Sequence, residues 1–347
     1  MTDRKSALVV CPGRGTYNKT ELGYLARHHG GRADMIQIME DERARLGQPS
    51  LASLDQSERY SLATHTRGDN ASLLIHACAM GDFFSIDRAE YEIVAVTGNS
   101  MGWYVALACA GAVSQETGAR IVNTMGTYMQ EALIGGQIVY PLTDDDWHPV
   151  RDRRAAVLDL LRELNEQPEF DVDVSIELGG MIVLAGNEQG LQALRDRLEL
   201  IDRFPMDLKN HAAFHTRLQE PISQRGLKTF QPSDFLMPAI PMIDGRGHIW
   251  ACGVSAGDAL HEYTFGHQVT ETYDFTRAIG VAMREFAPDC IIVLGPGATL
   301  GGAVAQSLIE IDWQGLDSKS AFQRRQESDP ILLAMGRDDQ RPLVVGG

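Results

Sequence analysis

Short apolar runs alternate with helix-forming stretches along the first third of the chain. Residues 6–11 form an apolar run that ends at Pro12-Gly13, and residues 93–96 form a second, β-branched run. Runs of this length that are closed by turn residues are typical of buried strands. Residues 32–46, 70–83, 103–112 and 115–132 have the composition or spacing of helices. The alternation predicts an α/β domain.

The segment 134–208 has a pattern of its own. Strand-like runs at 137–142, 172–178, 181–185 and 203–208 are interleaved with helical stretches at 149–165 and from Asn187 to about residue 200. Gly179-Gly180 joins the two middle strands, and Asn187 is a suitable N-cap for the second helix. The order β-α-β-β-α-β is the ferredoxin-like pattern, which predicts a small subdomain inserted into a larger one.

The α/β alternation then resumes. We predict strands at 240–243 and 290–294, and helices at 271–286 and from about residue 298, after the turn at 295–297. Residues 316–347 are polar and end in Gly-Gly, so we expect a surface-wrapping or partly disordered tail. The predicted division is a large subdomain at 1–133 and 209–315, a small subdomain at 134–208, and a C-terminal tail at 316–347.

Composition narrows the class of protein. A chain of 347 residues can bury one large core together with a smaller one. The net charge of −16 argues against general nucleic-acid binding, and no apolar run approaches the length of a membrane span. The N-terminal apolar run is too short for a signal peptide. The five cysteines are scattered without paired spacing, so we expect reduced thiols in a cytoplasmic protein, with no disulfide framework and no zinc site.

One motif carries chemistry. Residues 98–102, Gly-Asn-Ser-Met-Gly, fit G-x-S-x-G between a predicted strand and a predicted helix. This motif places a serine at the apex of a sharp turn, where the flanking glycines let strand and helix pass closely. The following helix directs its free N–H groups at the site, and the N–H of Met101 would help to bind an oxyanion. We predict Ser100 as a nucleophile; the alternative is a chance serine in an ordinary strand-turn-helix.

The stretch around Ser100 resembles the serine block of malonyl-CoA:acyl-carrier-protein transacylases and polyketide synthase acyltransferase domains. Further blocks match in the same order: residues 11–15 resemble F-P-G-Q-G, residues 213–221 resemble A-F-H-S-P-L-M-x-P, residues 240–243 resemble the strand before the variable loop, and residues 294–300 resemble E-x-G-P-G-x-x-L. The resemblance covers roughly residues 6–310. It implies an α/β-hydrolase-like large subdomain with an inserted ferredoxin-like small subdomain.

The resemblance also assigns roles. His215 would take the proton of Ser100, for which the ordinary pKa of histidine is suited; His211, four residues earlier, is the rival. The backbone N–H of Arg14 would join that of Met101 in the oxyanion hole. The main-chain carbonyl of Gln268 would orient the histidine ring in place of a carboxylate.

Several positions depart from the family pattern. Met125 falls where malonyl-specific members carry an arginine that holds the substrate carboxylate, so we predict a neutral acyl group in a pocket that Met125 lines. Arg14 replaces the family glutamine, and its guanidinium offers another way to hold a carboxylate. Asn99 replaces the histidine before the serine, and Asn70 falls near a substrate-side glutamine. We expect both asparagines at the substrate site.

The resemblance implies acyl transfer from a coenzyme A thioester, through an acyl-serine, to the phosphopantetheine thiol of an acyl carrier protein. The partners are then an acyl-CoA and an acyl carrier protein, and neither a metal nor a bound cofactor is required. Three alternatives stay open: a hydrolase that edits acyl-carrier-protein thioesters with the same two residues, a weakly catalytic scaffold of a synthase complex, and an unrelated α/β-hydrolase. The last would need an acid between serine and histidine in chain order.

Overall fold

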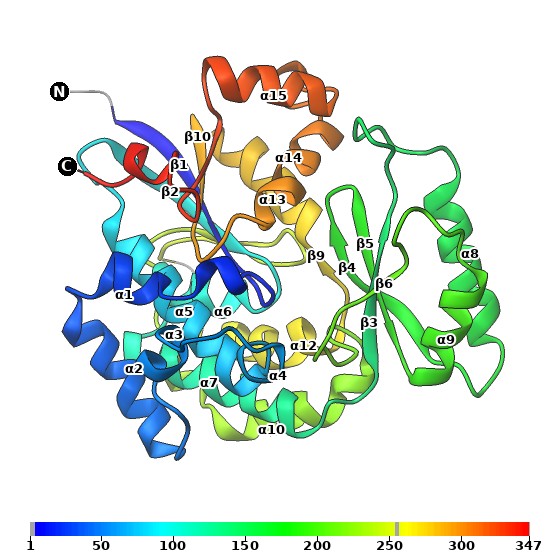
Figure 1. Ribbon diagram of the computed structural model, residues 1–347, viewed down its shortest axis with the longest axis horizontal. Coiled ribbons are helices and arrows are strands. Elements are labelled where there is room, and N and C mark those ends of the chain that lie inside the picture. Colours follow the sequence, from blue (N-terminus) through cyan, green and yellow to red (C-terminus); the bar gives the residue numbers. More distant parts are fainter. Residues whose placement is uncertain (1–3, 254–256, 347) are drawn as a thin grey trace.

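The computed structural model describes residues 4–253 and 257–346, which form two α/β units, each around its own sheet (Figure 1). The strands are β1 Lys5–Cys11, β2 Tyr91–Gly98, β3 Gly136–Pro141, β4 Val172–Leu178, β5 Met181–Gly186, β6 Met206–Asp207, β7 Met242–Ile243, β8 Ile249–Trp250, β9 Tyr273–Asp274, β10 Cys290–Val293 and β11 Leu332–Ala334. The helices are α1 Tyr24–His29, α2 Ala33–Arg45, α3 Leu51–Asp55, α4 Leu62–His65, α5 Gly68–Ser85, α6 Gly102–Cys109, α7 Gln115–Glu131, α8 Arg153–Asn165, α9 Glu188–Arg197, α10 Glu220–Thr229, α11 Gly257–Glu262, α12 Gln268–Thr270, α13 Phe275–Phe286, α14 Leu300–Glu310 and α15 Lys319–Ser328.

The large sheet has the strand order β11-β10-β1-β2-β7-β8, in which every pair is parallel except the last. Ala7 to Cys11 of β1 are completely buried, as expected for a central parallel strand that helices cover on both faces. In Figure 1, α5, α6 and α7 lie on one side of these strands, and α13 and α14 lie on the other. Because β1 and β2 are parallel, their carboxyl ends meet at the same edge of the sheet. Parallel α/β sheets place their ligand-binding sites at this edge.

The small sheet has the order β6-β3-β5-β4-β9. Its first four strands pair antiparallel, and α8 and α9 connect them, so the predicted ferredoxin-like unit is confirmed. Asn187 caps α9 by accepting a hydrogen bond from the N–H of Gly190. The fifth strand, β9, comes from the returning chain and pairs parallel with β4. This strand ties the small unit to the large one.

Several element boundaries differ from the predictions. The helix expected at 271–286 begins only at Phe275, because Tyr273 and Asp274 form β9 and the Asp274 carboxylate caps the helix. The strand expected at 203–208 is reduced to β6. The helix expected from residue 149 begins at Arg153.

The prediction of a surface tail at 316–347 fits α15, which buries none of its residues, but it was wrong for residues 331–335. Its described part contains α15 and the strand β11, which extends the large sheet beside β10. Residues 331–335 are buried in the main core. A short apolar run of this kind is typical of a strand, but the polar residues on either side of it favoured the prediction of a tail.

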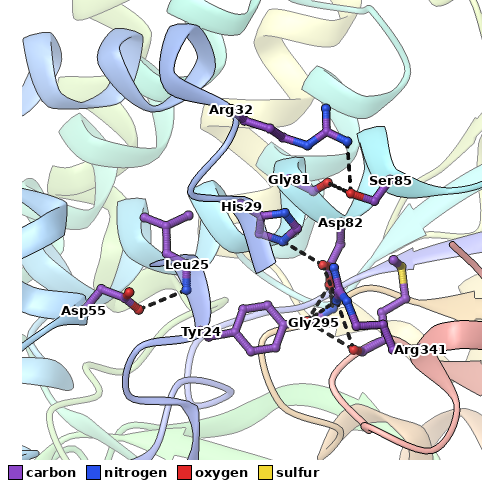
Figure 2. A network of polar contacts seen from close by, with 11 residues as sticks. Tyr24, Leu25, His29, Arg32, Asp55, Gly81, Asp82, Ser85, Gly295 and Arg341 are labelled. Atoms are coloured by element: carbon purple, nitrogen blue, oxygen red, sulfur yellow. Dashed lines mark hydrogen bonds and ion pairs between the residues drawn. The ribbon is translucent and has the colours of Figure 1, made fainter. Parts of the chain in front are cut away.

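A buried polar network fastens this C-terminal segment (Figure 2). The Asp82 carboxylate on α5 accepts hydrogen bonds from the Tyr24 hydroxyl at 2.8 Å, from the Gly295 N–H at 2.7 Å and from Arg341 Nη1 at 2.7 Å. Nε2 of His29 lies 2.9 Å from the same carboxylate. Burial opposes the ionisation of Asp82, but the hydrogen bond from His29 and the charge of Arg341 outweigh it, so the pKa is lowered. One carboxylate thus joins α1, α5, the turn after β10 and the C-terminal segment.

Within residues 4–253 and 257–346, no helix is long and apolar enough to cross a membrane. All five cysteines are free thiols. Over the same residues, no group of three or more His, Cys, Asp or Glu side chains is placed to hold a metal ion.

Candidate active site

Ser100 stands at the apex of the turn between β2 and α6, with a φ of 56°. A left-handed conformation at a residue other than glycine costs roughly 1–3 kcal/mol and is common at functional sites. The two flanking glycines make the turn possible. A Cβ on Gly98 would lie 2.3 Å from the carbonyl oxygen of Gly102, and a Cβ on Gly102 would lie 2.4 Å from that of Cys11. The sharp turn predicted from the motif is therefore present.

The structure brings Ser100 and His215 together across 115 positions of sequence. Oγ of Ser100 lies 2.7 Å from Nε2 of His215, and Nδ1 of His215 lies 2.6 Å from the carbonyl oxygen of Gln268. A carbonyl can only accept a hydrogen bond, so Nδ1 carries the proton in the neutral ring. Nε2 then presents its lone pair to the serine hydroxyl. This is the arrangement of a general base beside a nucleophile.

His215 is held in an apolar setting. It is only 4 % exposed, and its ring lies 5.4 Å from that of Tyr273. Burial lowers the pKa of His215 to about 4, against the opposing effect of the hydrogen bond to Gln268 and with a smaller contribution from His267. The imidazole is therefore neutral at pH 7, which is the form that a base requires.

Gln268 contacts both members of the pair. It follows a π-helical turn at Tyr263–His267, a distortion that often marks functional sites. Besides its carbonyl contact with His215, its Nε2 donates to the carbonyl oxygen of Ser100 at 3.1 Å. Its Oε1 accepts a hydrogen bond from the hydroxyl of Tyr104 at 3.0 Å.

Two tyrosines that sequence reasoning missed support the site. Tyr104 fixes the amide of Gln268, and the hydroxyl of Tyr273 donates to the carbonyl oxygen of Gly98 at 2.6 Å, next to the serine turn. Both residues are buried. A buried tyrosine hydroxyl normally finds a partner, but the sequence does not show which one.

His211 is not part of the pair. Its Nδ1 lies 2.7 Å from Oε1 of Gln137 on the small sheet. The amide of Gln137 donates to Oγ of Ser175 at 2.6 Å, and Oγ of Ser175 donates to the carbonyl oxygen of Phe214 at 2.8 Å. His211 therefore belongs to a chain of hydrogen bonds that holds the backbone immediately before His215.

The backbone N–H groups of Met101 and Arg14 have no hydrogen-bond partner in the part of the chain that the structure describes. Both residues line the same cavity as Ser100. Each follows a strand of the large sheet, β2 in one case and β1 in the other. Both groups are therefore free to donate a hydrogen bond, which an oxyanion hole requires.

Arg14 also lines the cavity, and backbone carbonyls hold its side chain. Its Nη2 donates to the carbonyl oxygens of Thr66 at 2.7 Å and Asn210 at 2.9 Å. Its guanidinium carbon lies 5.4 Å from the centre of the Phe214 ring. Burial lowers the pKa of Arg14 to about 10, although Asp69 acts in the opposite direction, so the guanidinium is still a cation at neutral pH.

The cavity at Ser100 is small, with a volume of about 20 Å³, roughly the room of one water molecule. Most of the side chains around it are apolar or uncharged. It is lined by Arg14, Ser72, Ser100, Met101, Tyr104, Val122, Gly126, Met129, Phe214, His215, Gln268 and Val269.

Three residues expected at the substrate site do not line this cavity in the described structure. Met125 is buried with its sulfur against Gly226 of α10, while α7 presents Val122, Gly126 and Met129 to the cavity. The resemblance placed Met125 on a helix that does line the cavity, but Met125 lies on another side of that helix.

Asn70 and Asn99 depart from expectation in different ways. Oδ1 of Asn70 accepts from Arg43 at 2.8 Å and its Nδ2 donates to the carbonyl of Thr64 at 3.0 Å, so a buried arginine holds it in a structural role. Asn99 is adjacent to Ser100 but is not among the lining residues, and its Oδ1 has no partner within the described chain.

Comparison with known protein families returned no matching family model. Individual curated proteins do match. Tenellin synthetase of Beauveria bassiana is 24% identical over 233 residues, 62% of this chain and 5% of that protein. The polyketide biosynthesis protein PksE of Bacillus subtilis is 25% identical over 307 residues, 85% of this chain and 36% of that protein. The chain thus spans only a minor part of these two relatives.

One relative matches along nearly its whole length. The malonyl CoA-acyl carrier protein transacylase of Salmonella typhimurium is 22% identical over 327 residues, covering 90% of this chain and 96% of that protein.

Solved structures agree with this match. The malonyl-CoA:acyl carrier protein transacylase of Xanthomonas oryzae has a TM-score of 0.76 at 18% identity and covers 100% of both chains. A type II polyketide synthase acyl-carrier protein in complex with its malonyl-transacylase contains a chain with a TM-score of 0.68 at 18% identity, covering 88% of this chain and 93% of that one. The chain therefore has the fold of the malonyl-CoA:acyl-carrier-protein transacylases, and at 22–25% identity it is similar in sequence to one of these enzymes and to part of a polyketide biosynthesis protein.

Proposed function

We propose that the protein is an acyltransferase that moves a short acyl group from a coenzyme A thioester, through an ester on Ser100, to the phosphopantetheine thiol of an acyl carrier protein. The observation that carries this proposal is the 2.7 Å contact between Ser100 Oγ and His215 Nε2, with the ring oriented by the Gln268 carbonyl. A neutral histidine in this tautomer can accept the serine proton directly.

The reaction has two matching halves. His215 Nε2 takes the proton of Ser100 as Oγ attacks the thioester carbonyl carbon, and the N–H groups of Met101 and Arg14 stabilise the oxyanion. The carbon–sulfur bond then breaks, and the leaving thiolate takes the proton back from His215. A second thiol repeats these steps in reverse order and regenerates the free serine.

The comparisons support both the donor and the acceptor. A relative that matches over most of its length is named for transfer between malonyl-CoA and acyl carrier protein. A structural neighbour is a transacylase in complex with its acyl-carrier protein. Neither half of the reaction calls for a metal or a bound cofactor.

The acyl group depends on the side chains that line the cavity. The expectation of a neutral acyl group rested on Met125, which packs against α10 and not around Ser100. The lining residues Val122, Met129 and Val269 are apolar, and a cavity this small leaves no room for a long acyl chain unless its walls move. Arg14 is the charged exception among them.

Intact mass spectrometry tests the proposal. The protein is incubated with acetyl-, propionyl- and malonyl-CoA, and we expect an adduct of acyl mass that is absent in Ser100→Ala. Ser307→Ala is the matched control, because this serine is buried in α14, outside the site, and should retain the adduct. The absence of any adduct on the wild type, or an adduct that persists in Ser100→Ala, would refute the proposal.

The second half-reaction separates transfer from hydrolysis. Adding phosphopantetheinylated acyl carrier protein to the purified acyl-enzyme should move the acyl mass onto the carrier. Release of the free acid, with the carrier left unmodified, would instead identify a thioester hydrolase that uses the same two residues.

A further inference from the structure

Arg14 is the only side chain with a permanent charge among the residues that line the Ser100 cavity in the described structure. The other ionisable group close to the nucleophile, His215, is neutral at pH 7 because burial lowers its pKa to about 4. The lining of the cavity in the described structure therefore includes one residue with a fixed positive charge.

The groups that anchor Arg14 are neutral. A guanidinium has five N–H donors, of which Nη2 carries two, and those two match the carbonyl oxygens of Thr66 and Asn210. Nε and Nη1 are buried and have no hydrogen-bond partner within the described residues. Three donors of a buried cation are thus left unused.

No carboxylate in the described chain forms an ion pair with Arg14. Asp69, which influences its pKa, is itself bound by Arg67, whose Nε and Nη2 lie 3.0 and 2.8 Å from its two oxygens. A buried cation without a counter-ion is costly, and native structures rarely retain one unless a ligand completes it.

We infer that the missing partner is the substrate, and that Arg14 selects acyl groups that end in a carboxylate. This inference rests on the acyl transfer proposed for Ser100. It assigns specificity to the loop after β1, whereas the resemblance placed the carboxylate-binding residue on the helix that here carries Met125.

The position of Arg14 also limits the length of the acyl group. Its backbone N–H is a proposed donor to the oxyanion, and its side chain would hold the far carboxylate, so one residue would contact both ends of the acyl group. This fits a short dicarboxylic acyl group better than a long one. The two carbonyl contacts and the ring of Phe214 hold the guanidinium in place before substrate arrives, so little ordering is needed on binding.

Malonyl-CoA and acetyl-CoA are suitable probes because their acyl groups differ by one carboxylate. We expect the wild type to form malonyl-Ser100 at least about 10-fold faster than acetyl-Ser100 in rapid-quench mass spectrometry. Arg14→Gln keeps the backbone N–H and removes the charge. It should lower the ratio of the malonylation rate to the acetylation rate by roughly 10- to 100-fold, the range of one charge-assisted hydrogen bond. Arg14→Lys should recover part of the preference.

Arg67→Gln is the matched control, since Arg67 is exposed, directly follows Thr66, which anchors Arg14, and is bound to Asp69 rather than to the cavity. It should leave the malonyl-to-acetyl ratio unchanged. Equal rates for the two thioesters in the wild type, or a ratio that Arg14→Gln does not alter, would overturn the inference.

A binding measurement separates this inference from the proposed function. In the Ser100→Ala background, which cannot form an acyl-serine, malonyl-CoA should bind at least about 10-fold more tightly than acetyl-CoA by calorimetry, and adding Arg14→Gln should abolish the difference. If that preference is found but no acyl-serine forms in the wild type, the acyltransferase proposal fails and the assignment of Arg14 stands. Equal binding of the two thioesters contradicts the assignment whether or not acylation occurs.

Discussion

The rate of serine acylation should begin to fall only at a pH far below the range in which histidine usually titrates. Burial lowers the pKa of His215 from 6.5 to about 4, and the base works only when neutral. At pH 5.5 a group with a pKa of 4 is about 97 % neutral, whereas one with a pKa of 6.5 is about 10 % neutral. The rate of serine acylation at pH 5.5 should therefore be nearly that at pH 7, instead of about tenfold lower.

The rate of Ser100 labelling by a fluorophosphonate between pH 4 and 8 measures this directly, because the probe itself does not titrate in that range. His215→Ala provides the background rate at each pH. A midpoint between pH 6 and 7 in the wild type would refute the reasoning. It would mean that the imidazole is more solvated, or more strongly paired with an anion, than its buried position indicates.

A loss of rate through unfolding at low pH must be distinguished from a loss through protonation of His215. The lowered pKa of His215 also predicts how the stability of the fold changes with pH. The unfolded chain binds a proton on this histidine near pH 6.5, but the folded chain does not until about pH 4. The neutral His215 therefore makes its full contribution to the free energy of unfolding above pH 6.5. This contribution is at most about 3 kcal/mol, and it is lost as the pH falls towards 4. Urea unfolding at pH 5 and pH 7 should show a smaller loss in His215→Gln than in the wild type.

Three substitutions test other parts of the argument. Arg341→Met leaves a buried carboxylate without its cation and should lower the free energy of unfolding by about 3–5 kcal/mol in urea, whereas Arg337→Met, which breaks an exposed pair, should change it by less than about 1 kcal/mol. Tyr104→Phe frees the amide of Gln268 and should reduce the acylation rate by roughly 3- to 10-fold with KM unchanged, so an unaltered rate would contradict the positioning role. Gly102→Ala pushes a Cβ against the end of β1 and should abolish labelling of the serine; full labelling would show that the turn tolerates a wider separation.

Local signals were enough to predict the turn at Ser100 and the small unit. The glycines around Ser100 encode a turn that few other residues permit, and the apolar alternation between residues 136 and 208 encodes strands and helices in a recognisable order. In both cases the information is contained in neighbouring residues.

The predictions that failed depended on partners distant in sequence. Asn70 is held by Arg43, and Met125 packs against Gly226, so neither orientation could be seen in a helix taken alone. The strand at 332–334 exists because β10 offers a free edge, and the polar residues around it hid this pairing. Tyr104 and Tyr273 were missed because a tyrosine in an apolar stretch does not indicate which backbone carbonyl or side chain its hydroxyl will meet.

The position of the base depends on the small unit as much as on the serine turn. Ser175 on β4 donates to the carbonyl of Phe214, immediately before His215, and β9 pairs with β4 while carrying Tyr273 against the His215 ring. Tyr273 also bonds to the carbonyl of Gly98 at the end of β2, so one residue contacts the base and the strand that presents the nucleophile. The 2.7 Å contact between serine and histidine is therefore fixed by the junction of the two sheets. The inserted unit thus contributes to the geometry of the pair. A large unit that folded without it would retain Ser100 and Gln268, but it would lose Ser175, which holds the backbone before His215, and β4, with which β9 pairs.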